Sequence, residues 1–173
     1  KVIDFFFILK MDKKYLINVI TSGEAATHAI NQKKFGKTFF HLGPSRDSSV
    51  FERVKDNLTT IDNCDFILCT GLFDEDDPDL DKPQLHENDL DYYKNFLAKH
   101  ISKKLVCTNP DLTVHRGNIE ELCAGSVAKV FENLGGEVVY YGKPHKEVYN
   151  MCFSENEKVL AIGDNLRTDI KGA

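Results

Sequence analysis

A short apolar run at residues 64–70 is the feature that most constrains the fold of this chain. Asn63 precedes the run and Gly71 follows it, and both residue types are frequent in turns. A short run that is apolar without alternation is typical of a strand buried on both faces of a parallel sheet. Parallel strands must be joined by crossover connections, which are usually helices, so the run predicts an α/β domain.

Strand and helix patterns alternate along the rest of the sequence. Further strands are predicted over residues 16–21, 37–42, 104–108, 137–141 and 158–162. Helices are predicted over residues 2–11, 22–32, 50–58, 87–100, 119–134 and 146–153, and from residue 167 onward. Ser22 is the predicted N-cap of the helix over 22–32. The alternation indicates an α/β fold with a mostly parallel sheet.

Composition and charge exclude several classes of function. The 173 residues carry a net charge of −5, which gives no basic field for a nucleic-acid backbone. No apolar run approaches the ~20 residues that cross a bilayer, so no membrane partner is expected. The five cysteines are odd in number and lack C-x-x-C spacing, which argues against a zinc knuckle or a redox pair. We therefore expect reduced thiols and a cytoplasmic protein.

An aspartate follows the last predicted strand. Residues 158–164 read Lys-Val-Leu-Ala-Ile-Gly-Asp, so a buried strand delivers Asp164 at its carboxyl end, where ligands bind in open α/β sheets. A carboxylate there is costly without charged partners, and a hard divalent cation is the natural partner. Asp169, in the first turns of the following helix, can hold the Asp164 loop by hydrogen bonding or reach the metal through water. The alternative is that Asp164 only caps that helix.

A lysine follows the preceding predicted strand in the same way. Residues 141–144 read Tyr-Gly-Lys-Pro, which places Lys143 between the strand and a proline that suits the start of a helix. Such a lysine is a point charge for a phosphate oxygen or a nearby carboxylate, although most lysines are solvated surface residues. A cation and an anion at successive strand ends predict half of a magnesium-dependent phosphotransfer site.

These motifs resemble those of a known family. Gly-Lys-Pro at 142–144 and Gly-Asp-x-x-x-x-Asp at 163–169 look like the third and fourth motifs of the haloacid dehalogenase (HAD) phosphatase superfamily. Residues 20–25 (Ile-Thr-Ser-Gly-Glu-Ala) and 107–111 (Cys-Thr-Asn-Pro-Asp) are similar to the capped class IIA, NagD-like branch. The resemblance covers essentially the whole chain, and the motifs occur in the family's order.

The resemblance implies a Rossmann-like core with an inserted α/β cap domain. Residues 34–141 would form the cap, and residues 1–33 and 142–173 would be pieces of an incomplete core. The implied homodimer contacts lie in the cap. The acidic run over 74–81 lacks the central glycine and distal glutamate of a calcium loop, so we interpret it as a solvated cap loop.

The resemblance also implies roles for individual residues. Lys143 would neutralise phosphate charge, Asp164 would bind Mg²⁺, and Asp169 would support them, with Asn165 close to the metal loop. Asn109 and Asp111 are substrate-binding candidates, although an Asx turn that orders their loop explains them equally well. His145, beside the Gly-Lys-Pro motif, can touch the substrate or simply start a helix.

The implied activity is hydrolysis of a small sugar or nucleotide phosphate through a phospho-aspartate. The family forms that intermediate on a strand ending in Asp-x-Asp, and neither this strand nor the phosphate-binding Ser/Thr strand has a match in the 173 residues. We therefore expect that the chain is a piece of a longer polypeptide and is itself inactive or nearly so, because binding groups cannot replace a nucleophile. The alternative is a non-catalytic, cap-bearing domain used for binding or oligomerisation.

Overall fold

The structure is a computed structural model that describes residues 10, 12–16, 18–73, 90–154 and 156–173. The helix predicted over 2–11 lies outside the described residues apart from Lys10, and the acidic run over 74–81 lies wholly outside them. No helix of the described part is long and apolar enough to span a membrane.

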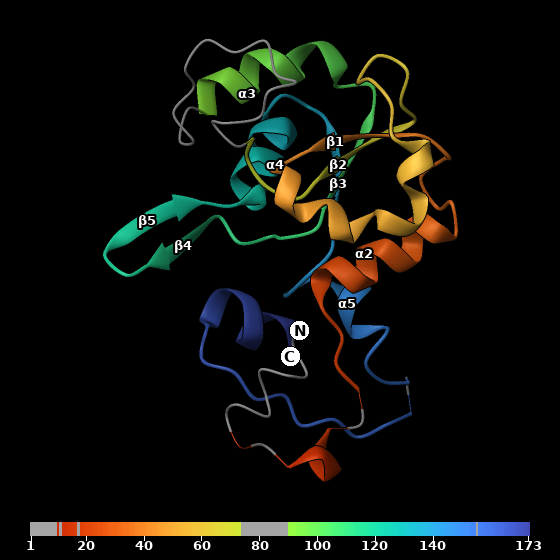
Figure 1. Ribbon diagram of the computed structural model, residues 1–173. Coiled ribbons are helices and arrows are strands. Elements are labelled where there is room, and N and C mark those ends of the chain that lie inside the picture. Colours follow the sequence, from red (N-terminus) through yellow and green to blue (C-terminus); the bar gives the residue numbers. More distant parts are fainter. Residues whose placement is uncertain (1–9, 11, 17, 74–89, 155) are drawn as a thin grey trace.

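A four-stranded parallel sheet forms the middle layer of the upper part of the molecule in Figure 1. Its strands lie in the order β1 (Phe39–Leu42), β2 (Phe66–Cys69), β3 (Lys104–Cys107) and β6 (Glu137–Tyr140). Cys69 pairs with Leu42 on one side and with Cys107 on the other, so all the strands end at one edge of the sheet. Every residue of β2 is buried, which confirms the α/β fold and the buried parallel strand predicted from the apolar run.

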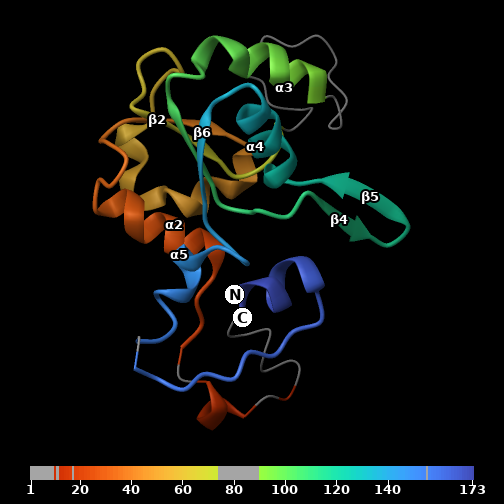
Figure 2. The ribbon, with the colours of Figure 1, turned by 180° about the vertical axis from the view of Figure 1, so that it is seen from behind.

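Helices cover both faces of the sheet (Figures 1 and 2). On one face lie α3 (Leu90–Leu97), which leads into the 3₁₀ turn η4 (Ala98–His100), and α4 (Ala124–Asn133). On the other lie α2 (Ser22–Asn31), α5 (Lys146–Tyr149) and the 3₁₀ segments η2 (Ser45–Val50) and η3 (Glu52–Asn57).

Successive side chains of β2 point alternately to the two faces of the sheet. Ile67 and Cys69 pack with α3 and α4, whereas Phe66 and Leu68 pack with α2. The sheet therefore separates two apolar cores.

Helix α2 presents a face of small apolar residues to the sheet. Ala25, Ala26 and Ala29 are buried against β1 and β2. The N-cap is Thr21, whose hydroxyl accepts a hydrogen bond from the Glu24 N–H at 3.1 Å, so the prediction of Ser22 was wrong by one residue. Although α2 precedes residue 34, it shares a core with the strands that follow. The division into cap and core pieces stays a prediction.

The helix predicted over residues 119–134 is wrong in its first part. Residues Ile119–Leu122 form β5, which pairs antiparallel with β4 (Thr113–Arg116), and the helix begins only at Ala124. Ile119 and Leu122 are spaced for a helical face, but Gly117 adopts a φ of +64° and with Asn118 closes a tight hairpin turn. The apolar spacing of this segment fits a helix and a strand equally well, and the turn at Gly117 and Asn118 favours the strand.

Two other predicted helices are modified. The helix predicted over 50–58 is replaced by 3₁₀ segments, with a kink at Val54. The helix predicted over 146–153 is shortened to α5.

Below the sheet, the C-terminal segment runs without regular structure as far as the π-helical turn η5 (Leu166–Ile170). The strand predicted over 158–162 is not formed, and Leu160 and Ile162 are 83% and 89% exposed. Residues 18–21 of the predicted strand over 16–21 are likewise not extended into a sheet, and nearby η1 (Lys13–Tyr15) is a 3₁₀ turn. A strand gains its hydrogen bonds only from a neighbour, and among the described residues none pairs with either segment.

Candidate functional site

Lys143 and Asp169 form an ion pair across the end of the sheet. Lys143 follows β6 and Gly142, whereas Asp169 lies in η5 at the far end of the C-terminal segment. The Asp169 side chain is 14% exposed and the Lys143 side chain 54% exposed. The Asp169 carboxylate raises the pKa of the Lys143 ammonium, and the Lys143 ammonium lowers the pKa of Asp169. Both groups are therefore held in their charged forms at neutral pH.

The second oxygen of Asp169 holds the preceding loop. The Asn165 N–H donates to Asp169 Oδ2 at 3.2 Å, and Asn165 Oδ1 in turn accepts from the Arg167 N–H at 2.8 Å. A side chain at Gly163 would place its Cβ 2.2 Å from the Asp169 Cβ, so only glycine admits this approach. Asp164, between these residues, is exposed. Of the two roles predicted for Asp169, the structure shows the hydrogen bond to the loop.

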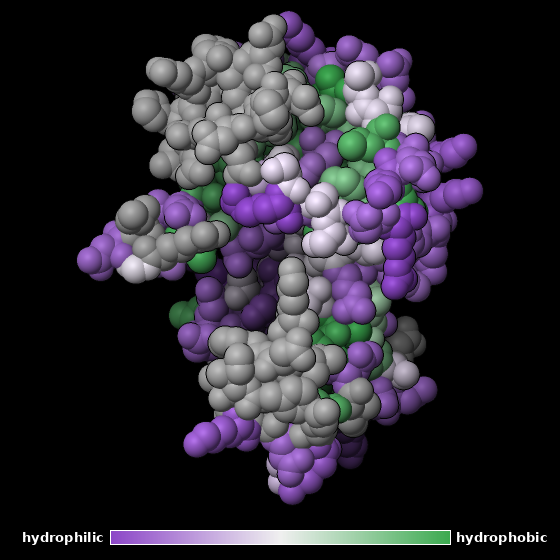
Figure 3. Space-filling view, in the orientation of Figure 1, coloured by the Kyte–Doolittle hydropathy of each residue, from purple (hydrophilic) through white to green (hydrophobic). Residues whose placement is uncertain are grey.

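A cavity of about 290 Å³ opens beside this ion pair, and we call it the Lys143 cavity. It brings together four of the residues singled out in the sequence, namely Asp111, Lys143, His145 and Asn165, but neither Asp164 nor Asn109 lines it. Arg167 and Lys171 add two further cations to its wall. Figure 3 shows that the surface is hydrophilic and hollowed below the β4–β5 hairpin. With three cations and one carboxylate in its lining, the cavity favours an anionic ligand.

Sequence reasoning missed Arg167 and Lys171. Arg167 lies inside the 163–169 motif, and Lys171 follows it at the i, i+4 spacing that places two residues on one side of a helical turn. That spacing was a usable signal, but it becomes meaningful only once η5 is known to face Lys143.

His145 also lines the Lys143 cavity. Its ring stacks on Tyr140 with a centroid distance of 4.7 Å and an interplanar angle of 13°. Burial lowers the pKa of His145, so the ring is neutral at pH 7. It also precedes α5 as the N-cap residue, although its side chain makes no capping hydrogen bond.

Pro110 and Asp111, from the Asn-Pro-Asp segment after β3, form another part of the lining of the Lys143 cavity. Asn109 Oδ1 accepts a hydrogen bond from the Asp111 N–H at 3.2 Å, which is the Asx turn considered above. A Cβ at Gly125 would lie 2.2 Å from the Pro110 carbonyl oxygen, so the start of α4 packs directly against this turn. The turn is thereby fixed, and Asp111 faces the cavity whereas Asn109 does not.

The described residues do not form a metal site by themselves. They contain no group of three His, Cys, Asp or Glu side chains placed to hold a cation. Asp164 offers one exposed carboxylate, and the carboxylate of Asp169 is already bound by Lys143 and Asn165. Mg²⁺ usually keeps several waters and is held by only one or two carboxylates, so Asp164 could supply one protein ligand, but the described residues do not by themselves define a magnesium site.

Comparison with known proteins identifies solved structures that have a similar fold. No protein-family model and no curated protein matches the chain. A haloacid dehalogenase-like hydrolase from Brucella suis 1330 aligns with a TM-score of 0.71 and 28% identity, over 89% of this chain and 59% of its own. A p-nitrophenyl phosphatase from Archaeoglobus fulgidus gives a TM-score of 0.61 and 14% identity, over 87% and 56% of the two chains.

A third solved structure was determined with a metal. Glycerol phosphate phosphatase Rv1692 from Mycobacterium tuberculosis, in complex with magnesium, gives a TM-score of 0.57 and 19% identity, over 89% of this chain and 45% of its own. The same phosphatase has also been solved with calcium. The present chain spans less than two thirds of the length of each of these structures. It shares the α/β fold of the haloacid dehalogenase-like hydrolase from Brucella suis 1330, and a p-nitrophenyl phosphatase and a glycerol phosphate phosphatase are also among its structural neighbours.

Proposed function

We propose that the chain supplies the cation-lined half of the active site of a phosphoric monoester hydrolase of the HAD class IIA type. The observation that carries the proposal is the Lys143–Asp169 ion pair on the edge of a cavity that also presents Arg167 and Lys171. The resemblance of both motifs to those of a phosphatase family, and the phosphatases among the structural neighbours, support the same assignment.

The three cations account for the binding of a phosphate ester. Lys143 offers its ammonium as a point charge to one phosphate oxygen, while Asp169 keeps it charged and fixes its direction. Arg167 can form two parallel hydrogen bonds to the other two terminal oxygens of the phosphate. Charge that develops on the phosphoryl group during transfer is stabilised by the same groups, because they are oriented before the reaction begins.

The nucleophile in this proposal is an aspartate that is not among the 173 residues. Its carboxylate would attack phosphorus, the alcohol would leave, and water would hydrolyse the aspartyl phosphate. The described residues supply no buried aspartate at the Lys143 cavity, whose lining carboxylate, Asp111, is exposed.

Mg²⁺ is the proposed cofactor, with Asp164 as one of its ligands and further ligands supplied by the rest of the site. A bound divalent cation would polarise a phosphoryl oxygen. The proposed partner is a small sugar or nucleotide phosphate, and homodimer contacts are proposed for the cap.

Titration of the chain with inorganic phosphate in a calorimeter tests the binding half of the proposal. The Lys143→Met variant should bind phosphate about tenfold more weakly or worse, as expected for loss of a charged hydrogen bond. Lys55→Met is the matched control, since Lys55 lies in η3 in an exposed ion pair with Glu52. Equal affinity for the two variants would contradict the role of Lys143.

Hydrolysis of p-nitrophenyl phosphate with Mg²⁺ tests the missing nucleophile. The 173-residue chain should show no turnover above background, because cations bind the ester without attacking it. Turnover that disappears in a Lys143→Ala variant would show that the chain holds its own nucleophile, and this part of the proposal would be wrong.

A further inference from the structure

The connections that leave β1 and β2 diverge to opposite faces of the sheet. After β1 the chain forms η2 and then Phe51, which is buried in the core shared with α2. The next described helix after β2 is α3, whose Tyr93 and Leu97 lie in the core on the other face. Where neighbouring parallel strands send their connections to opposite faces, a crevice opens at their carboxyl ends, and such crevices are where α/β sheets bind ligands.

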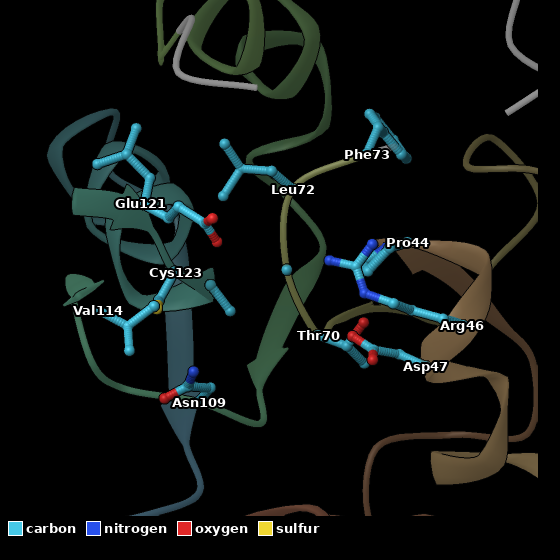
Figure 4. A pocket seen from close by; sticks show the side chains of 13 residues that line it. Pro44, Arg46, Asp47, Thr70, Leu72, Phe73, Asn109, Val114, Glu121 and Cys123 are labelled. Atoms are coloured by element: carbon cyan, nitrogen blue, oxygen red, sulfur yellow. The ribbon is translucent and has the colours of Figure 1, made fainter. Parts of the chain in front are cut away.

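A second cavity, of about 240 Å³, lies at this point, and we call it the Arg46 cavity (Figure 4). One wall comes from the loops after β1 and β2 and carries Arg46, Asp47 and Thr70. The opposite wall is the junction of β5 with α4, from which the Glu121 side chain extends toward Arg46 across the opening. The Asn109 amide lies at the base in this view.

The wall formed by the two loops is tightly fixed. The Thr70 hydroxyl is hydrogen-bonded to Nε2 of His41 at 2.9 Å. A Cβ at Gly43 would lie 2.1 Å from that hydroxyl, so the loop after β1 rests directly on the end of β2. The Thr70 hydroxyl and the start of the loop after β1 are therefore positioned before any ligand arrives, which lowers the entropy cost of binding at this part of the wall.

The segment between β3 and β4 separates the two cavities. Asn109 and Val114 line the Arg46 cavity, whereas residues 110–113 between them line the Lys143 cavity. The two sites thus share one wall, although their chemistry differs. The Lys143 cavity presents three cations and one carboxylate, whereas the Arg46 cavity presents one cation and two carboxylates.

The side chains that line the Arg46 cavity can form hydrogen bonds with the hydroxyl groups of a ligand. A guanidinium, two carboxylates, an amide and a hydroxyl together donate and accept hydrogen bonds, and the planar groups can each bind two adjacent hydroxyls. Among the described residues of the lining, Phe73 is the one aromatic side chain. It is 7% exposed and packs its ring on Tyr92, Tyr93 and Phe96, so it offers little stacking surface to a nucleobase. The volume lies below the ~300 Å³ at which pockets for drug-sized ligands begin.

We propose that the Arg46 cavity is a binding site for a polyol of monosaccharide size. The ligand is either the sugar part of a phosphate ester or a free sugar, which present the same hydroxyls. Glu121 accepts hydrogen bonds from them on one wall, and Asp47 and Arg46 bind them on the other. The site does not depend on the phosphatase activity proposed above, because none of its lining residues contributes to the Lys143 cavity.

Amide NMR spectra of the ¹⁵N-labelled chain, titrated separately with D-glucose, sorbitol and uridine, test the proposal. Glucose or sorbitol should shift the resonances of Thr70, Asn109 and Cys123, and uridine should shift them less at equal concentration. A titration with glucose 6-phosphate distinguishes the two sources. Shifts that extend to Lys143 and Arg167 identify the sugar part of an ester, and shifts confined to the Arg46 cavity identify a free sugar.

Two variants of neighbouring glutamates sharpen the test. Glu121→Gln should weaken sugar binding about tenfold, the loss expected for a hydrogen bond to a charged group. Glu120→Gln removes the same charge from the preceding residue of β5, which does not line the cavity, and this variant should bind the sugar like the unaltered chain. Asp47→Asn, on the opposite wall, gives a second measurement should Glu121→Gln lower the urea midpoint. Stronger binding of uridine, no shifts with either polyol, or equal affinity for the two glutamate variants would overturn the proposal.

Discussion

Replacement of Gly142 by alanine tests whether the position of Lys143 depends on a close backbone contact. Gly142 adopts a φ of +130°, and a Cβ there would lie 2.5 Å from Pro110 Cδ. An unfavourable backbone conformation costs on the order of 1–3 kcal/mol. Carbon atoms need about 3.5–4.0 Å, so Pro110 must also move by roughly 1 Å, which adds about 1–3 kcal/mol as overpacking does in a core.

Gly135→Ala is the matched control for this substitution. Gly135, just after α4, has a φ of +93°, but a Cβ there meets nothing within 4 Å. It should therefore show the backbone cost alone, and Gly142→Ala should be about 1–3 kcal/mol less stable than Gly135→Ala.

Urea unfolding followed by circular dichroism measures this difference, with the slope checked for constancy between the two variants. Gly142→Ala should also weaken phosphate binding, because Pro110 and Lys143 both line the Lys143 cavity. Gly135→Ala should not. If Gly142→Ala proved no less stable than Gly135→Ala, the contact with Pro110 would not fix this end of β6, and the reasoning would be wrong.

Three further predictions concern the core and the titrating groups. Phe131→Ala should lower the free energy of unfolding by about 3–5 kcal/mol in urea, and Phe131→Leu by clearly less, since Phe131 is fully buried between α4 and the sheet. Asp169→Asn should lower stability at neutral pH. Because the folded-state pKa of Asp169 lies below its ordinary value of 3.8, the difference from the unaltered chain should vanish as the pH falls through that lowered pKa, and a difference that persisted in strong acid would count against the ion pair. The His145 ring should titrate below its ordinary pKa of 6.5 in an NMR experiment because burial disfavours its charged form, and a value at or above 6.5 would show that the ring is not buried against Tyr140.

The central sheet could be predicted from the sequence because its signals are local. β2 was found from a buried apolar run, and β1, β3 and β6 from similar short patterns before turn residues. The segment Ile119–Leu122 was mispredicted because its apolar spacing fits a helix as well as a hairpin strand. Only the preceding Gly117 and Asn118 distinguish the two, because a two-residue turn that contains glycine favours a hairpin.

The features that could not be predicted depend on long-range arrangement. Residues 158–162 have the composition of a buried strand, but a strand exists only where another lies beside it. The Arg46 cavity depends on which face of the sheet each connection between strands covers, and no local sequence pattern predicts this. For the candidate site, the Gly-Lys-Pro and Gly-Asp motifs located Lys143 and Asp169, whereas the contribution of Lys171 required knowing how η5 faces the sheet.

The most direct test of the account is an amide NMR map of where inorganic phosphate binds the chain. The chain offers a second basic cavity at the opposite end of the sheet, lined by Lys99, His100 and Lys103, which serves as an internal comparison. We predict that the largest shifts occur at Lys143, Arg167 and the residues around them, and that Lys143→Met abolishes these shifts. Shifts centred on Lys99 and Lys103 instead, or shifts unchanged by Lys143→Met, would contradict the assignment of Lys143 and Asp169 to a phosphate site.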